Sequence, residues 1–468
     1  MCRTKSFLAS LQQNKLTHKF NMDKIRLQER IDKIVLHKFW GYPIFFFILF
    51  IIFQATFMIG AYPMGWIENG IDLLSHYIIN NMPEGLLKDL IIDGIIAGVG
   101  GVIVFLPNIA ILFLFISVLQ SSGYIQRAAK LMDKMMHRIG LSGNSFIPLI
   151  MGFGCNVPAI MSTKTIEDKH SRIITVLVNP LMSCSARLPV YLLLCAAFFE
   201  QNAGLVIFGI YTLGILLAML FAYIFRKFVV TDEDTECEYL LTPYQFPSIT
   251  KTLSDVWEQV SQYLRKMGGI ILIASILIWF LGYFPKNKGL EKEYLNQTEL
   301  ITQDFAARIE ADPASKQVLL NEMDSILQHN KYLFETNLTE NSYIGRIGKG
   351  IEPVLAPLGF NWKISSALLT GIAGKELIVS TMGVLYSGDD GGNTLIHALA
   401  HSRGNDFNPA IALSFLVFVL IYFPCIATVT SIRTATQETR WSVFTIIYTT
   451  LLAWIVSFAV YRIALLFL

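Results

Sequence analysis

The sequence is poor in charge and carries no motif for holding nucleotide phosphates. Only 15% of its 468 residues are charged, whereas 53% are hydrophobic. The 37 Lys and Arg residues nearly balance the 35 Asp and Glu residues, so the net charge of +2 provides no basic surface for nucleic acid. The phosphate-loop pattern G-x-x-x-x-G-K-[ST] is absent, because the nearest string, GIAGKE at 371–376, has the wrong spacing. We therefore expect no nucleotide site in this chain, no nucleic-acid partner and no enzyme activity.

Cysteine is also scarce, and its positions exclude two common uses. The six cysteines stand at positions 2, 155, 184, 195, 237 and 425, with no CxxC and no Cys/His spacing of a zinc site. Four of them lie in apolar segments, which argues against a framework of disulfides. A role as individual thiols within the apolar segments remains.

Long apolar runs dominate the rest of the chain. The mean hydropathy is +0.51, and several runs exceed the roughly 20 residues that an α-helix needs to cross a bilayer. The predicted fold class is an all-α polytopic membrane protein with about eight to ten membrane helices or re-entrant segments. The first span, Trp40 to Ile59, follows residues 1–38, which are too polar for a signal peptide and predict a basic cytoplasmic segment. Residues 61–92 are expected to form an outer segment.

Basic residues and polar stretches divide the chain into two membrane halves. We expect the first half at 39–228, a cytoplasmic linker at 229–263 and the second half at 264–468. The second half carries a polar outer insertion, 285–345, whose periodicity suggests short soluble helices. Lys and Arg at the inner ends of the spans predict an N-terminus inside and a C-terminus outside the cytoplasmic membrane.

The two halves repeat one plan. SFIPLIMGFGCNVPAIMST at 145–163 and NWKISSALLTGIAGKELIVSTMGVLY at 361–386 both combine an apolar approach, a glycine break and an apolar exit with Ser and Thr. NPLMSCSA at 179–186 and YFPCIATVTS at 422–431 both place a proline shortly before a cysteine. Because the linker changes the side from which the second half enters, the repeats are inverted. Such an architecture places a substrate site at mid-membrane depth between broken helices.

The breaks in these repeats carry the residues that we expect to line an ion path. A cysteine thiolate is a soft ligand for a borderline metal ion, and the glycines and proline around Cys155 permit an unusual backbone there. The predicted path residues are Cys155, Cys184, Cys425, Asn156, Asn179, Glu376, Met161, Met182, Ser183 and Ser185. The predicted gate backbone consists of Gly152, Gly154, Pro158, Pro180, Gly371, Gly374 and Pro424.

Each of these side chains also has a structural explanation. A free cysteine is usually a small buried hydrophobic residue, which is the explanation that we prefer for Cys195. Asn156 and Asn179 either offer carbonyl oxygens to the ion or cap the broken helices, and methionine in an apolar helix is mostly filler. Glu376 is costly inside a membrane unless it is wet or partnered, and Lys375 could neutralise it.

One long stretch closely resembles the membrane domain of a known family. GFGCNVPAIMSTKTIEDKHSRIITVLVNPLMSCSARLPVY at 152–191 contains G-x-G-C-x-V-P-A-I and N-P-x-M-S-C-S-A-R-L-P-V-Y, which resemble the paired gate motifs of FeoB-type ferrous iron transporters. The resemblance extends from about residue 29 to the C-terminus, with TGIAGKELIVSTMGVLY and YFPCIATV as counterparts in the second half. It implies Fe²⁺ as the transported substrate, a pore lined partly by cysteines, and a cytoplasmic GTPase domain fused ahead of the membrane part.

The chain departs from this family ahead of its first span. Residues 1–39 are too few for a nucleotide-binding domain. The GTPase that the resemblance implies is therefore expected on a separate chain, in a part removed from a longer product, or nowhere. A small accessory protein, membrane lipid and a second copy of the chain are the other partners expected.

Two other functions stay open on the sequence. Gate-type segments also resemble those of nucleoside carriers, so the cargo could be another divalent metal ion, or a nucleoside held by Asn, Ser and Thr side chains. The chain could also be a membrane anchor or receptor for a cytoplasmic GTPase. Competition between Fe²⁺ and a labelled nucleoside tests the first alternative, and transport by the chain alone in liposomes tests the second.

Overall fold

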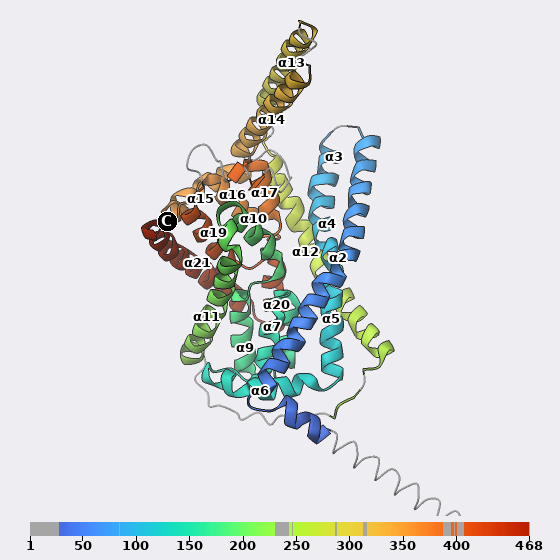
Figure 1. Ribbon diagram of the computed structural model, residues 1–468, viewed down its shortest axis with the longest axis vertical. Helices are drawn as coiled ribbons and strands as arrows, with labels where there is room; N and C mark the ends of the chain where they lie inside the picture. Colours follow the sequence, from blue (N-terminus) through green and yellow to red (C-terminus); the bar gives the residue numbers. More distant parts are fainter. Residues whose placement is uncertain are drawn as a thin grey trace, which may run out of the picture.

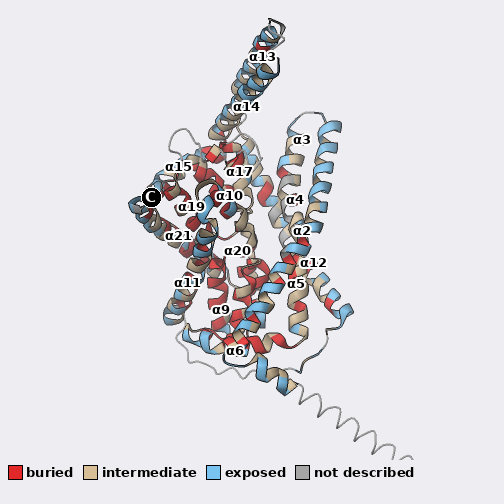
Figure 2. Ribbon diagram, viewed as in Figure 1, coloured by how far each residue is buried: buried red, intermediate tan, exposed pale blue. Residues whose placement is uncertain are grey.

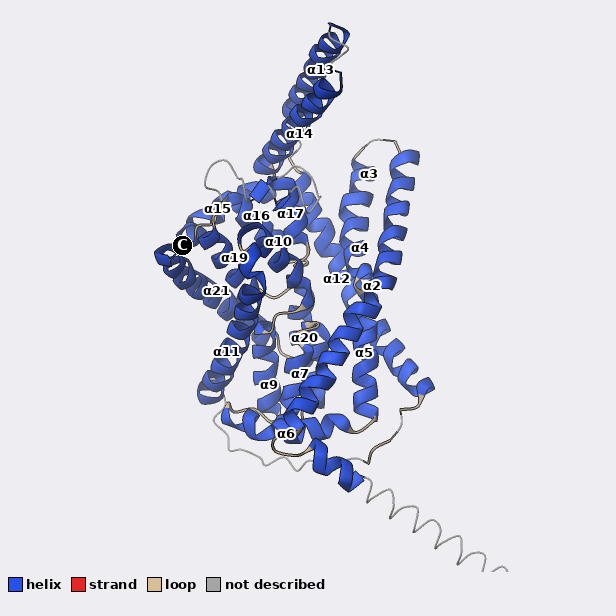
Figure 3. Ribbon diagram, in the orientation of Figure 1, coloured by secondary structure: helices blue, strands red, loops and turns tan. Residues whose placement is uncertain are grey.

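The computed structural model describes most of the chain, and its regular elements are helices. The described residues are 28–83, 85–229, 243–245, 247–285, 288–311, 316–386, 395–396, 398–399 and 407–467. Figure 3 shows helices and connecting loops, with no strand in this part of the chain. The predicted all-α class is therefore confirmed. Cys2, Cys237 and most of the predicted segment 1–38 lie outside the described residues.

Several of these helices are long and apolar enough to cross a membrane. Among the described residues, the five that meet both criteria are Gly41–Asn81, Lys169–Phe198, Glu200–Phe228, Pro409–Thr436 and Thr439–Leu466. A sixth candidate is the pair α5 (Leu106–Ser121) and α6 (Tyr124–Arg138), which bend by 85°. Gly123 sits at this bend with a φ of 78°, a left-handed conformation that favours glycine. The chain is therefore polytopic.

The first long helix extends well beyond the predicted first span. Helix α2 (Gly41–Asn81) has 41 residues and continues past Pro63, so the first part of the predicted outer segment 61–92 belongs to the same helix as the predicted first span. At 1.5 Å per residue α2 is about 60 Å long, twice the ~30 Å hydrocarbon core. The chain then returns through α3 (Leu86–Asp89), the π-helical η1 (Leu90–Ile96) and α4 (Ala97–Val104) to α5, beside α2 in Figure 1.

The two halves contain the same order of helices. After α5 and α6 the first half continues with α7 (Phe146–Met151), α8 (Asn156–Ser162), α9 (Lys169–Val178), α10 (Leu188–Phe198) and α11 (Ala203–Val229). The second half consists of α12 (Ile249–Tyr283), α15 (Tyr343–Leu355), α16 (Trp362–Thr370), α17 (Leu377–Tyr386), α19 (Pro409–Ile421), α20 (Ile426–Thr436) and α21 (Thr439–Phe467). In Figure 1, α6 and α7 lie toward the lower end of the molecule, whereas α15, α16 and α17 lie toward the upper end. This placement agrees with an inverted repeat.

The broken inner helices form the core, and the unbroken helices surround it. In the most apolar 18 residues of Pro409–Thr436, 78% are buried, whereas the corresponding share for Thr439–Leu466 is 22%. Figure 2 shows this contrast between the buried centre and the exposed outer faces. The halves are tied together where the Tyr448 hydroxyl of α21 donates to the carbonyl of Leu177 in α9.

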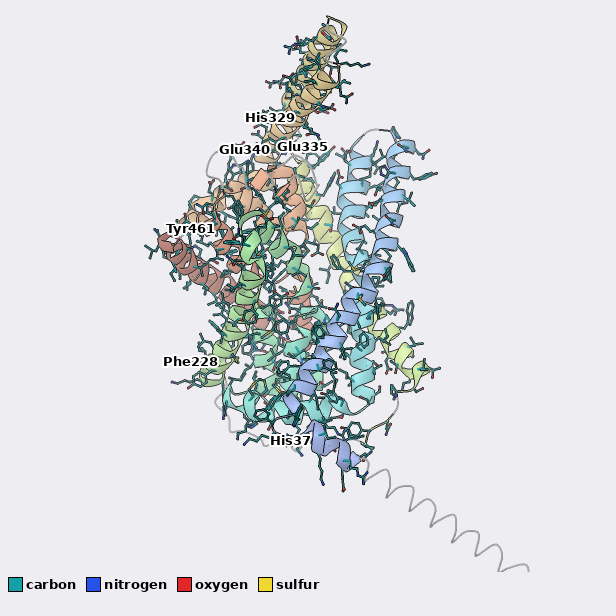
Figure 4. The ribbon with its side chains drawn as sticks, viewed as in Figure 1. His37, Phe228, His329, Glu335, Glu340 and Tyr461 are labelled. Atoms are coloured by element: carbon teal, nitrogen blue, oxygen red, sulfur yellow. The ribbon has the colours of Figure 1, made fainter. Side chains whose placement is uncertain are left out.

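The polar insertion forms a long helical hairpin. Helices α13 (Lys288–Ala311) and α14 (Lys316–Asn341) have 24 and 26 residues and pack against each other, so the prediction of short helices was wrong. Tyr294 of α13 stacks on Phe334 of α14, with ring centroids 4.3 Å apart, and this contact joins the two helices within the hairpin. The hairpin projects from the bundle in Figure 1, and Figure 4 labels His329, Glu335 and Glu340 along α14 near its base.

The predicted linker between the halves is shorter than expected. Helix α12 begins at Ile249, so the last part of the predicted linker 229–263 is helical. Tyr244, just ahead of α12, donates from its hydroxyl to Asp32 Oδ1 at 2.9 Å. Arg127 of α6 also donates to Asp32 Oδ1, at 2.5 Å, and its guanidinium lies 3.7 Å from the centre of the Tyr244 ring. This three-residue cluster joins the start of the chain, α6 and the linker.

Candidate metal-ion site

Four helices in the described part of the chain are broken near the middle of the bundle. In the first half one break separates α7 from α8. The other separates α9 and the 3₁₀ turn η4 (Asn179–Leu181) from the 3₁₀ turn η5 (Ser185–Arg187) and α10. In the second half the breaks separate α16 from α17 and α19 from α20. Cys155 and Cys184 have extended backbones, with φ/ψ of −154°/128° and −77°/161°. Glycine and proline at these breaks prevent a continuous helix. The sequence prediction of broken segments agrees with this arrangement.

The residue that directly precedes the second part of each broken helix has a side chain suited to metal binding. Cys155, Cys184 and Cys425 are the N-cap residues of α8, η5 and α20. Glu376 directly precedes α17. Glu376 thus lies at the second-half break that repeats the break at Cys155, and Cys425 lies at the break that repeats the one at Cys184. A helix N-terminus stabilises negative charge, which favours thiolate and carboxylate ligands at these places.

These four side chains line a single cavity of about 110 Å³. Its walls also contain Asn156, Ser185, Gly154, Gly374 and Pro424, all of them predicted path or gate residues. Among the described residues no three His, Cys, Asp or Glu side chains are close enough to hold a metal ion together. The cavity therefore brings sulfur and oxygen donors together without such a cluster.

Backbone hydrogen bonds join the two breaks within each half. In the first half the Gly154 carbonyl accepts from the Ser185 amide at 3.2 Å and from the Ser185 hydroxyl at 2.8 Å. In the second half the Ile372 carbonyl accepts from the amide of Ile426 at 3.1 Å. These bonds satisfy carbonyl groups that the broken helices leave without a partner. They also fix the two metal-binding positions of each half relative to each other.

Two glycines are required by close approach rather than by an unusual φ. A Cβ at Gly152 would lie 2.9 Å from the Met182 Cβ and 3.0 Å from Asn179 Oδ1. A Cβ at Gly371 would lie 2.3 Å from the Tyr422 hydroxyl oxygen. Each glycine therefore lets one broken segment pack directly against its neighbour in the same half.

Two buried cations beside the cavity bind backbone carbonyls. Arg187 donates to the carbonyls of Met182 and Pro180, at 3.1 and 3.2 Å. Lys375 donates to the carbonyl of Phe423 at 2.8 Å, and its ammonium lies 3.2 Å from the centre of the Tyr422 ring. Both cations thus lie where a helix ends and its partial charge is negative. Among the described residues Lys375 and Glu376 form no direct ion pair within 4 Å.

The structure separates the two predicted asparagines. Asn156 is buried against the cavity, and its Oδ1 has no hydrogen-bond partner among the described residues. Asn179 is fully buried away from the cavity and donates to the carbonyl of Pro148 at 2.9 Å. Asn156 is therefore placed to offer an oxygen to an ion, whereas Asn179 joins α7 to η4.

The remaining predicted side chains do not line this cavity. Met182 is buried in the main core, and Ser183 forms a hydrogen bond of 3.0 Å with the Tyr191 hydroxyl. Met161 lines a separate cavity nearer α6. Pro180, Gly152 and Gly371 lie at the breaks but do not line the cavity. Cys195 is buried in the core, as its featureless surroundings suggested.

One cavity residue was missed in the sequence analysis. Asn108 of α5 lines the cavity, and its Oδ1 has no hydrogen-bond partner among the described residues. A Cβ at Gly60 of α2 would lie 1.6 Å from this oxygen, so α2 approaches Asn108 closely. The signal available in the sequence was a single amide in the apolar string FLPN, where a polar side chain in a membrane helix needs a partner or water.

Comparisons with known proteins match the segments of the chain that contain these residues. A family model described as "Nucleoside recognition" and named Gate matches residues 102–198 and 264–439. A second model, described as "Ferrous iron transport protein B C terminus", matches residues 207–259. No solved structure matches the chain.

Curated relatives cover nearly the whole chain. A protein of Porphyromonas gingivalis named "Fe(2+) transport protein A/Fe(2+) transporter FeoB fusion protein" is 52% identical over 450 residues, 94% of this chain and 52% of that protein. The "Fe(2+) transporter FeoB" of Campylobacter jejuni is 39% identical over 97% of this chain and 67% of its own length. The Staphylococcus aureus (strain MSSA476) protein of that name is 36% identical over 98% of this chain and 62% of its own length. The chain thus spans about half to two thirds of the length of these relatives.

Proposed function

Because the chain belongs to the FeoB family of ferrous iron transporters, we propose that it is a membrane permease core that moves Fe²⁺ across the cytoplasmic membrane. The observation that carries this proposal is the placement of Cys155, Cys184, Glu376 and Cys425, one from each of the four breaks, around one cavity. Fe²⁺ is of borderline softness and accepts both sulfur and oxygen ligands. The relatives are named for the same ion.

The cavity supports transient binding. Thiols must lose their protons to bind a metal ion, so binding at Cys155 and Cys184 releases protons and depends on pH. Asn156 and Asn108 add neutral oxygens whose buried positions leave them free for an ion or its water. Since the donors are not arranged as a closed set of ligands, the ion is held weakly enough to leave.

The decisive experiment replaces two thiols together. We expect Cys155→Ser with Cys184→Ser to reduce Fe²⁺ uptake at least tenfold, with protein abundance in the membrane unchanged. Cys195→Ala is the matched control, because Cys195 is a thiol buried away from the cavity. Uptake by the double variant at the rate of the parent chain would remove the cysteines from the mechanism.

Size favours an ion over a nucleoside as cargo. Pockets for organic ligands usually have volumes of about 300–1,000 Å³. The cavity of about 110 Å³ is well below this range, although a family model that matches the chain is described as nucleoside recognition. Fe²⁺ flux that an excess of nucleoside leaves unchanged, and that Mn²⁺, Co²⁺ or Zn²⁺ reduces by competition, is the expected result.

The partners that we propose follow from the relatives' names and lengths. The P. gingivalis relative is named as a fusion with an Fe(2+) transport protein A, so a small accessory protein is a proposed partner. A GTPase unit and a second copy of the chain are further proposed partners. We also propose that the end carrying α6 faces the cytoplasm and that the C-terminus lies outside. Fe²⁺ transport by the chain alone in liposomes would exclude a role limited to anchoring a GTPase.

A further inference from the structure

A second cavity lies next to the cysteine-lined cavity, on the side of α6. Its volume is about 290 Å³, compared with about 110 Å³ for the first. Its walls come mainly from α5, α8 and α12. Val157 of α8 lines both cavities, so one side chain lies at their junction.

One face of α5 runs along both cavities. Phe105, Asn108 and Ile109 line the first, and Phe113, Ile116 and Gln120 line the second. Residues spaced three and four apart lie on one side of an α-helix. The two cavities therefore follow each other along α5, and the second reaches the end of α5 that leads into α6.

The junction between the cavities is apolar and buried. Val157, Ile109 and Phe113 are 5%, 9% and 6% exposed. Ile109 and Phe113 pack in one cluster with Val260 of α12, which holds their side of the junction. A narrow apolar constriction excludes ions because water leaves it readily.

The second cavity opens to water at its far end. Gln120, Lys164, Thr165 and Gln262 are exposed there, while Met161 is partly buried farther in. Its lining among the described residues contains amides, hydroxyls, the thioethers of Met151 and Met161 and the Lys164 ammonium, but no carboxylate. The amide and hydroxyl groups can form hydrogen bonds with the water around an ion.

The two volumes differ more than twofold, at about 290 Å³ and about 110 Å³. A water molecule needs about 10–15 Å³ of such cavity space. The second cavity therefore has room for more water around an ion than the cysteine-lined cavity has. An ion that moves into the cysteine-lined cavity meets thiols and Glu376, which can replace part of its water.

We propose that the second cavity is a vestibule for the hydrated divalent cation and that Val157, with Ile109 and Phe113, is the apolar seal separating it from the cysteine-lined cavity. The identity of the cation rests on the function proposed above, but the seal and the vestibule do not. Met161 and Ser162 of α8 face the vestibule, one turn beyond Val157. The vestibule accounts for the position of Met161, which the cysteine-lined cavity does not.

Thiol labelling from each side of the membrane tests the seal without iron. A charged, membrane-impermeant thiol reagent is applied to intact cells and to sealed inverted vesicles, and its reaction at each cysteine is quantified by mass spectrometry of peptides. In the full chain with Ser162→Cys, residue 162 is expected to react in one preparation only, which identifies the side of the vestibule. Cys155 is expected to react slowly from that side.

Opening the seal should then expose Cys155. Val157→Ala is expected to raise the rate of Cys155 modification from the vestibule side about tenfold, with labelling at Ser162→Cys unchanged. Val190→Ala is the matched control, because Val190 is fully buried in the core and lines neither cavity. Val157→Phe should enlarge the seal and slow Cys155 labelling below that of the parent, while residue 162 still reports an intact fold.

Two results would overturn the proposal. Equal Cys155 labelling in the parent and Val157→Ala chains would show that Val157 is no barrier, and a Ser162→Cys thiol protected from both sides would show that the vestibule is closed. If the chain proved not to transport iron, the same labelling patterns would still be expected. The two proposals can therefore fail separately.

Discussion

Replacement of Gly371 by alanine tests whether the second-half break depends on close packing. Gly371 has a φ of −62° and a ψ of −8°, which alanine adopts without strain. The added Cβ would lie 2.3 Å from the Tyr422 hydroxyl oxygen and 2.7 Å from Ile378 Cγ1. Both neighbours are buried, with 4% and 0% exposure, so neither can move into open space.

The expected destabilisation has three parts. Inserting a methyl group into a packed core costs about 1–3 kcal/mol. Displacing Tyr422 also removes its hydrogen bond to the Leu368 carbonyl, worth about 1 kcal/mol, and disturbs its contact with the Lys375 ammonium, worth up to about 2 kcal/mol when desolvated. Because neighbours relax and these terms overlap, we expect a total of about 2–4 kcal/mol.

The assay is thermal unfolding in detergent together with Fe²⁺ flux in liposomes. Gly371→Ala should lower the melting temperature by several degrees and reduce flux, since Tyr422 contacts Lys375, which lines the cavity. Gly209→Ala in α11 is the matched control, because a Cβ there meets nothing within 4 Å. A Gly371→Ala chain that melts and transports like Gly209→Ala would refute the packing argument.

Three further predictions concern other contacts. Ser185→Ala should weaken Fe²⁺ binding up to about fivefold, because it removes one ~1 kcal/mol hydrogen bond to Gly154, and Ser185→Thr should retain binding in the same titration. Although burial alone would raise the pKa of Asp168, hydrogen bonds from the Ser171 side chain and from the amides of the first turn of α9 lower it below its usual range. This N-cap therefore stabilises the fold above the ordinary carboxyl pKa, and Asp168→Ala should cost about 1 kcal/mol at neutral pH, with the difference in melting temperature vanishing as pH falls through the lowered value. Arg127→Met should cost about 3 kcal/mol by leaving the carboxylate of Asp32 without its buried partner, and equal melting of variant and parent would contradict this.

The breaks were predictable from sequence, but the directions of their side chains were not. Glycine, proline and cysteine in GFGCNVP and NPLMSCS interrupt apolar runs that would otherwise continue as helices. At a break the backbone leaves the helical region, as at Cys155, so the 3.6-residue period no longer predicts which way the next side chain points. Asn156 and Asn179 have similar contexts in sequence, and yet one faces the cavity and the other binds the carbonyl of Pro148.

Long-range packing explains the other differences. Asn108 has no periodic partner in sequence, and it gains a role only because α5 lies beside the breaks of the other helices. The lengths of α13 and α14 depend on their packing against each other, as in the stack of Tyr294 on Phe334, which local patterns do not reveal.

The origin of the four cavity positions from four breaks, two in each half, has a consequence for ancestry. Each half supplies two corners from its own two breaks, and the opposite half supplies the others from the opposite direction. A protein half as long would lack two of the four corners. Only two such half-length proteins, inserted in the membrane in opposite orientations, would together supply all four positions. Joining them in one gene would then let each half evolve its own donors, two thiols in the first half and a carboxylate with one thiol in the second.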